Sequence, residues 1–133
     1  MWRLAGLDAI FREAWAGGVV LAGVSAGALC WFEAGLTDSF GRPLRAMRDG
    51  LGFLAGSLCP HYDGEKDRRA AFHRAVADGT VPPGIAADDG VALVYRGTEL
   101  AEIVSSRPAA RAWRVERTAE GVHETELIPR YLE

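Results

Sequence analysis

Hydrophobic residues recur at helical spacing at the start of the chain, at positions 4, 7, 10, 11, 14 and 15. This spacing predicts an amphipathic helix over residues 2–16 that ends at the two glycines after it. Residues 19–24 are apolar without interruption, which predicts a short strand buried on both faces, as in a parallel sheet. Residues 26–33 suit a second helix, and residues 35–43 are rich in turn formers. Residue 25 therefore falls at a predicted strand-to-helix junction.

The later elements are short runs bounded by turn-forming residues. We expect a strand over 51–58 and a helix over 65–78. A strand over 91–95, a turn at 96–97 and a further strand that ends at residue 104 follow, and then a strand pair over about 112–117 and 122–128. The alternation within 91–104 is typical of a hairpin. No repeat or long linker divides the chain, so we expect one domain over residues 1–133. The order of elements predicts an α/β fold with a β-rich C-terminal part.

Composition excludes several classes of function. The 133 residues are 49% hydrophobic and 25% charged with a net charge of −3, which is ordinary for one globular domain. No run of like charge indicates a nucleic-acid or membrane surface, and no segment has the pattern of a signal peptide or membrane span. We therefore expect a cytoplasmic protein with a small-molecule or peptide partner. Cys30 and Cys59 lack metal-ligand spacing, which favours two free thiols.

Ser25 is the first candidate for chemistry, because "GVSAG" places a glycine two residues to either side of it. Between a buried strand and a helix, this is the sequence form of a nucleophile elbow. Side chains at Gly23 and Gly27 would be expected to collide with neighbouring backbone, and the N–H of Ala26 could point at an oxyanion. The alternative is a tight turn that only packs a helix onto a strand.

A catalytic serine needs a base, and the base needs an orienting carboxylate. Of the three histidines, His61 follows a predicted strand end, where α/β sheets gather functional residues. His73 suits a helix surface and His123 a structural place in the last strand pair. Asp88 and Asp89 lie in a turn before an apolar strand, a position that aspartate also favours for turn formation alone. The order Ser25, His61, then Asp88 or Asp89 differs from that of an α/β-hydrolase.

The stretches "GVSAGA", "CPHYD" and "AADDGVALVYRG" together resemble the peptidase E family of serine peptidases, the aspartyl dipeptidases, with cyanophycinase as a more distant relative. The resemblance runs over essentially the whole chain. It implies a three-layer, mostly parallel sheet of the class I glutamine-amidotransferase type, with no metal or cofactor. It also implies a serine peptidase that acts on short peptides, typically dipeptides with an N-terminal aspartate.

Position by position, the resemblance assigns Ser25 as nucleophile and His61 as general base. Asp89 matches the third member, often glutamate in the family, so Asp88 and Asp89 both stay open. Asp38 in "LTDSFG" matches another acidic position linked to family activity, although a helix-end turn would explain it equally.

The family's arginine for the substrate carboxylate follows the histidine, which makes Arg68 and Arg69 the candidates. A guanidinium fork suits a carboxylate, but either residue also fits a solvated helix surface.

One departure limits the resemblance. Family members carry a further α/β half before the position of Met1, with a glycine-rich turn that supplies a second oxyanion donor. Without it, the predicted strand 19–24 has an unpaired edge. We therefore expect either a fragment of such an enzyme or a homodimer that pairs across that edge. A catalytically impaired or non-catalytic remnant is the alternative function, and an amidotransferase-like domain is a third.

Overall fold

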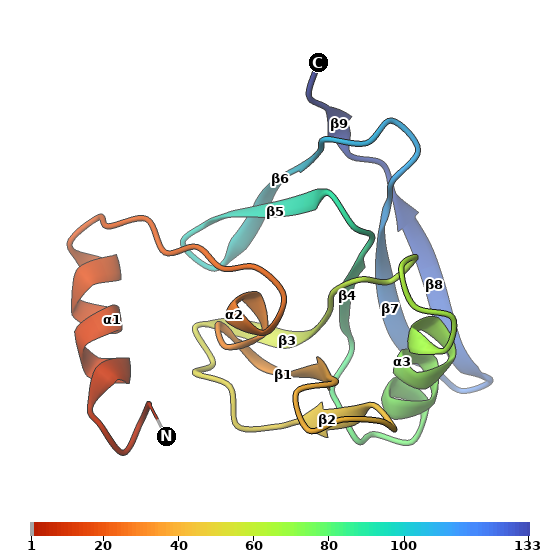
Figure 1. The fold of residues 1–133 in the computed structure, drawn as a ribbon, viewed down its shortest axis with the longest axis horizontal. Helices are drawn as coiled ribbons and strands as arrows, with labels where there is room; N and C mark the ends of the chain where they lie inside the picture. The colour runs from red at the N-terminus through yellow and green to blue at the C-terminus, as the bar shows by residue number, and fades with distance from the viewer. Residues whose placement is uncertain (1) are drawn as a thin grey trace.

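The computed structural model describes residues 2–133, which form three helices and two sheets (Figure 1). The helices are α1 (Leu7–Ala16), α2 (Ala26–Leu29) and α3 (Arg68–Ala77). The larger sheet has the order β2 (Arg45–Met47), β1 (Phe32–Thr37), β3 (Leu54–Cys59), β4 (Gly84–Ala87), β7 (Ala112–Thr118) and β8 (Gly121–Leu127). The smaller sheet has the order β5 (Val91–Arg96), β6 (Glu99–Ser105) and β9 (Arg130–Tyr131).

The expected α/β class is confirmed, but the expectation of a mostly parallel sheet is wrong. In the larger sheet only β1–β3 and β3–β4 pair in parallel, whereas β1–β2, β4–β7 and β7–β8 are antiparallel. Short connections explain part of this, because a tight turn such as the one between β7 and β8 can join only antiparallel strands. The parallel strands β3 and β4 lie at the centre, and their carboxyl ends meet at one edge.

Both faces of the central strand β3 are covered. The consecutive residues Leu58 and Cys59 are 4% and 0% exposed and belong to different apolar clusters, because successive strand residues point to opposite faces. The cluster around Cys59 includes Phe72 and Val76 of α3. The cluster around Leu58 includes Leu29 of α2, with Leu93 of β5 packed against it. Sheet strands, α2 and α3 therefore form the core that holds the loops at the strand ends.

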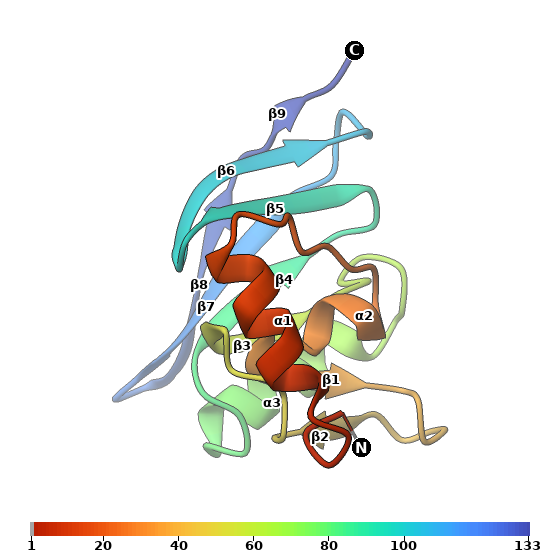
Figure 2. The ribbon, with the colours of Figure 1, turned by 90° about the vertical axis from the view of Figure 1, so that its left-hand side faces the viewer.

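Helix α1 packs on the outside of this core through aromatic rings. None of its residues is buried; it stands to the left of the rest of the chain in Figure 1 and in front of it in Figure 2, where that side faces the viewer. Phe11 contacts Trp31 edge-on at 5.4 Å between ring centroids, and Trp15 stacks on Phe53 at 5.5 Å. The helix is shorter than the expected 2–16. No helix among residues 2–133 is long and apolar enough to cross a membrane.

The prediction of a buried strand over residues 19–24 is wrong. This segment is irregular, and the side chains of Val20 and Val24 are 88% and 84% exposed. Hydrophobicity alone does not make a strand, because strands also need a hydrogen-bonded neighbour. Within residues 2–133 the segment pairs with no strand of either sheet.

The bounds of several other helices and strands also differ from those predicted. The helix expected over 26–33 ends at Leu29, and β1 begins at Phe32 and extends into the expected loop 35–43. The short strands β2, β4 and β9 were not predicted. The expected strand 51–58 corresponds to β3, the expected helix 65–78 to α3, the expected hairpin to β5 and β6, and the last strand pair to β7 and β8.

Candidate active site

Ser25 lies at the sharp turn between the irregular segment 19–24 and α2. Its backbone has φ 54° and ψ −121°, a conformation that non-glycine residues rarely adopt. At Gly23 an added Cβ would lie 2.0 Å from the carbonyl oxygen of Gly27, so the turn excludes any side chain there. At Gly27 an added Cβ would meet nothing within 4 Å. The expected collision is therefore confirmed at Gly23 and wrong at Gly27.

The N–H of Ala26 is available beside Ser25. Its neighbours Gly27 and Ala28 donate their N–H groups to the carbonyls of Val24 and Ser25 at 2.9 Å each. No hydrogen bond from the Ala26 N–H is found among the described residues. Helix α2 has only four residues, so its dipole is small. Any oxyanion stabilisation here would come chiefly from the N–H itself.

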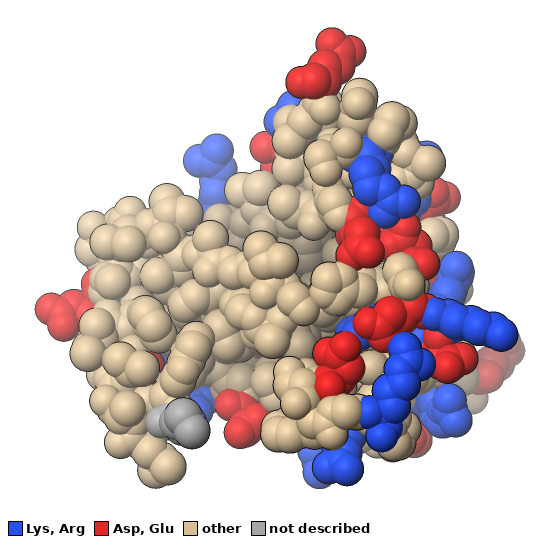
Figure 3. Space-filling view, viewed as in Figure 1, with Lys and Arg blue, Asp and Glu red and all other residues tan. Residues whose placement is uncertain are grey.

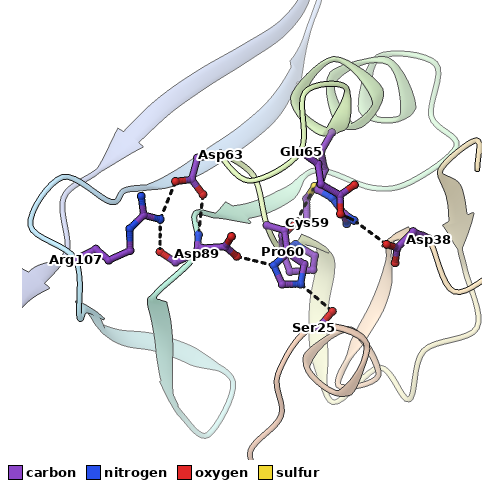
Figure 4. Close-up of polar contacts among 10 residues, drawn as sticks. Ser25, Asp38, Cys59, Pro60, Asp63, Glu65, Asp89 and Arg107 are labelled. Carbon is purple, nitrogen blue, oxygen red and sulfur yellow. Dashed lines mark hydrogen bonds and ion pairs between the residues drawn. The ribbon is translucent and has the colours of Figure 1, made fainter.

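His61 connects Ser25 to a carboxylate. It follows β3 with φ 56°, and its Nε2 lies 2.9 Å from the Oγ of Ser25 (Figure 4). Its Nδ1 lies 2.5 Å from Oδ1 of Asp89. Since a carboxylate only accepts, this geometry places the proton of a neutral imidazole on Nδ1 and leaves Nε2 free to accept from Ser25. The three side chains form one hydrogen-bonded chain in the order serine, histidine, aspartate.

Asp88, the alternative to Asp89, has a different set of contacts. Its Oδ2 accepts the N–H of Arg111 at 2.8 Å, and its own N–H donates to the carbonyl of Arg111 at 3.0 Å. Burial raises the pKa of Asp88 above its usual range, an effect that the hydrogen bond from Arg111 opposes. Asp88 thus ties the end of β4 to β7, and only Asp89 contacts His61.

Two residues that sequence reasoning did not single out hold the main chain of Asp89. Oδ1 of Asp63 accepts the N–H of Asp89 at 2.8 Å, and Nη1 of Arg107 donates both to Oδ2 of Asp63 at 2.8 Å and to the carbonyl of Asp89 at 2.9 Å (Figure 4). Partial burial raises the pKa of Asp63, but the hydrogen bonds from Asp89 and Arg107 outweigh it and hold this pKa below its usual value.

Arg68 lies in a second polar cluster. Its side chain is only 1% exposed, and its Nη2 donates to Oε1 of Glu65 at 2.8 Å and lies 3.6 Å from Oδ2 of Asp38. Its Nε is buried and has no hydrogen-bond partner among residues 2–133. The side chain of Asp38 is 55% exposed, and its carboxylate points toward this guanidinium (Figure 4). Asp38 and Arg68 are thus brought together, with the arginine already occupied by protein carboxylates.

Arg69 is engaged with β7 and β8. Its Nη2 pairs with Glu124, and its guanidinium lies over the ring of Trp113 at 4.7 Å. Glu124 also accepts from the hydroxyl of Tyr62 and lies 3.1 Å from Nε2 of His73. These contacts fasten α3 to β8, so the structure does not bring Arg69 together with Ser25, His61 and Asp89.

A cavity of about 660 Å³ adjoins Ser25, His61 and Asp89. Much of its wall is apolar and comes from residues 19–24, Trp31, Phe53, Leu93 and Tyr95. Figure 3 shows few charged side chains over α1 and the irregular segment after it, whereas charged side chains gather on the side of α3 and β8. Within the cavity, the apolar wall therefore adjoins the polar side chains of Ser25, His61 and Asp89.

The remaining candidates for special chemistry are thiols and metal ligands. Cys30 and Cys59 are both free, and Cys59 is fully buried. Burial raises the pKa of Cys59 to about 12, which makes its thiol unreactive. Among residues 2–133 no group of three or more His, Cys, Asp and Glu side chains is arranged to hold a metal ion.

The sequence of this chain is similar to known peptidase sequences. Residues 1–103 match the sequence model of peptidase family S51. The chain is also 52% identical over 132 residues to the "uncharacterized peptidase YgaJ" of Bacillus subtilis (strain 168). That alignment covers 99% of this chain and 56% of the relative, so the chain spans about half the length of the curated protein it matches.

Proposed function

This chain belongs to peptidase family S51, and on that premise we propose that it carries the catalytic triad of a serine-type peptidase that hydrolyses short peptides. The observation that supports this most is the hydrogen-bonded chain from Ser25 through His61 to Asp89. A serine hydroxyl is a weak nucleophile without a base, and an imidazole is a dependable base only when its ring is held in the right orientation. Each requirement has a residue to meet it.

In the proposed reaction His61 accepts the Ser25 hydroxyl proton at Nε2 while Oγ attacks the carbonyl carbon of the scissile bond. Asp89 holds the ring and stabilises the imidazolium that forms. The N–H of Ala26 donates to the oxyanion of the tetrahedral intermediate. His61 then returns the proton to the leaving amine, which gives an acyl-enzyme. Water hydrolyses this ester by the same proton transfers in the same order, and Ser25 is regenerated.

The proposed substrates are short peptides, including dipeptides with an N-terminal aspartate. Arg68 is the better candidate for the aspartate side chain, because Arg69 is paired with Glu124. A substrate carboxylate would take the place of Asp38, whose Oδ2 lies 3.6 Å from Nη2 of Arg68, whereas Glu65 at 2.8 Å would remain. Recognition of this kind requires Asp38 to turn outward.

Hydrolysis of chromogenic aminoacyl anilides tests both the proposed triad and the proposed recognition of an N-terminal aspartate. We expect turnover that falls on the order of 10⁴-fold or more in Ser25→Ala and in His61→Gln. His123→Gln is the matched control, because His123 is exposed on β8 and paired opposite Glu116. Faster cleavage of the aspartyl than of the asparaginyl or alanyl anilide would support aspartate recognition.

Full turnover in Ser25→Ala would contradict the proposed nucleophile. A folded wild-type chain that hydrolyses none of the anilides would favour the non-catalytic alternative. Equal rates on all three anilides would contradict aspartate recognition alone and leave the peptidase proposal standing.

A further inference from the structure

The bond between Asp89 and His61 depends on where the main chain of Asp89 is held. Asp89 lies just after β4 and its side chain is 48% exposed, so packing alone does little to fix it. We propose that Asp63 and Arg107 act as a positioning pair that fixes the backbone of Asp89 and thereby aims its carboxylate at Nδ1 of His61. This inference rests on the proposed function of the same site.

Both main-chain polar groups of Asp89 are held by this pair. Its N–H donates to Oδ1 of Asp63 at 2.8 Å and its carbonyl accepts from Nη1 of Arg107 at 2.9 Å. The same Nη1 donates to Oδ2 of Asp63 at 2.8 Å, so the two side chains also hold each other. With one contact on each side of the residue, the peptide planes around Asp89 have little freedom to rotate.

The contacts form a closed ring with the histidine. Asp63 stands two residues after His61 on the same short turn, in which the N–H of Gly64 donates to the carbonyl of His61 at 3.2 Å. The turn is joined to the end of β4 by the N–H of Tyr62, which donates to the carbonyl of Ala87 at 3.0 Å. The turn that carries His61 therefore also sets the distance between the imidazole of His61 and the carboxylate of Asp89.

Exposure distinguishes this role from a general stabilising one. The side chains of Asp63 and Arg107 are 32% and 49% exposed. Ion pairs with this much solvent contact add little to folding stability. Loss of the pair should thus leave the fold nearly as stable while it misplaces Asp89, and a misplacement of about 1 Å at a catalytic group can cost on the order of 10²-fold in rate.

Kinetics of four variants provide the first test. We expect Asp63→Ala to lower kcat for peptide or anilide hydrolysis on the order of 10²-fold with KM little changed. Asp63→Asn should lose less, because its amide oxygen can still accept the N–H of Asp89. Arg107→Ala should fall in the same direction. Arg130→Ala is the matched control, since Arg130 forms an exposed pair with Glu102 and lies outside the site.

Proton NMR of the full chain supplies a readout that needs no turnover, so it separates this inference from the proposed function. Nδ1 of His61 lies 2.5 Å from Oδ1 of Asp89, and the proton between them should give a resonance far downfield. This resonance should be absent from the spectrum of His61→Gln. We expect that resonance to be lost in Asp63→Ala and to be kept in Asp63→Asn and Arg130→Ala. The urea denaturation midpoints of all three variants should lie close to that of the wild type. An undiminished resonance and kcat in Asp63→Ala, or the absence of the resonance from the wild type, would overturn the proposal.

Discussion

The substitution Gly23→Ala tests the geometry of the serine turn most sharply. An added Cβ would lie 2.0 Å from the carbonyl oxygen and 2.3 Å from the carbonyl carbon of Gly27, and 2.8 Å from the nitrogen of Ala28. All three atoms belong to the backbone of α2, so no side chain can rotate away. Because ordinary contact begins near 3.4 Å, the turn and the helix would have to separate by about 1.4 Å.

That displacement is large for a catalytic group. Ser25 lies between the two clashing segments, and its Oγ is 2.9 Å from Nε2 of His61, so a shift of this size breaks the hydrogen bond. We expect kcat/KM to fall on the order of 10²-fold or more. Gly27→Ala adds the same methyl group in the same motif but meets nothing within 4 Å. Since alanine is favoured over glycine in a helix by about 1 kcal/mol, that variant should keep its activity and gain slightly in stability.

The assay is anilide hydrolysis by both variants beside the wild type, with circular dichroism and urea denaturation to verify that each is folded. The contrast between the two glycines carries the prediction, because the sequence motif treats them alike. If a folded Gly23→Ala retained wild-type kcat/KM, or if Gly27→Ala lost as much as Gly23→Ala, the reasoning from backbone contact at Ser25 would be refuted.

Three further predictions concern the surroundings of the triad. Gly64→Ala should lower kcat, because its Cβ would lie 2.6 Å from Oδ2 of Asp89 and push that carboxylate from its place, whereas unchanged kinetics would contradict the close approach. Burial raises the pKa of Cys59 from near 9 to about 12, so the folded chain keeps a proton that the unfolded chain releases. The free energy of unfolding should then fall as the pH rises from about 9 toward 12, and less steeply in Cys59→Ala, as urea titrations at several pH values would measure. Arg68→Ala should destabilise the fold by about 3 kcal/mol in urea denaturation, because it leaves Glu65 without its buried partner, and it should also raise KM for the aspartyl anilide if Arg68 binds the substrate carboxylate; unchanged stability would contradict the structural role of the pair.

Much of the fold follows from local patterns. The pair β7 and β8 and the hairpin β5–β6 lie close to their predicted bounds, because alternation and turn residues specify them locally. Residues 19–24 show the limit of such patterns. Their apolar run indicates burial, but whether a strand forms depends on a neighbour that composition cannot reveal, and Val20 and Val24 are exposed instead. The short strand β4 was missed because four residues are too few to show a period.

Some residues of the candidate site could likewise be predicted from the sequence, and others could not. Ser25 and His61 could be found because a glycine-flanked serine and a histidine after a strand have local signatures. The sequence did not decide whether Asp88 or Asp89 is the third member of the triad, because adjacent residues in a turn differ mainly in the direction of their side chains. Only the fold shows that Asp89 contacts His61. Asp63 was missed because a side chain that accepts a main-chain N–H 26 residues away has no signature, although its place two residues after His61 was a signal that could have been used.

The central claim is that Ser25 is a nucleophile activated by His61, and covalent labelling tests it most directly. The chain would be treated with a fluorophosphonate, which phosphonylates activated serine hydroxyls with loss of fluoride, and then digested and examined by mass spectrometry. The account predicts one adduct per chain, on the peptide that contains Ser25, formed in His123→Gln at the wild-type rate and at least 10²-fold more slowly in His61→Gln. An adduct on another residue, or labelling of Ser25 at the same rate without His61, would contradict it.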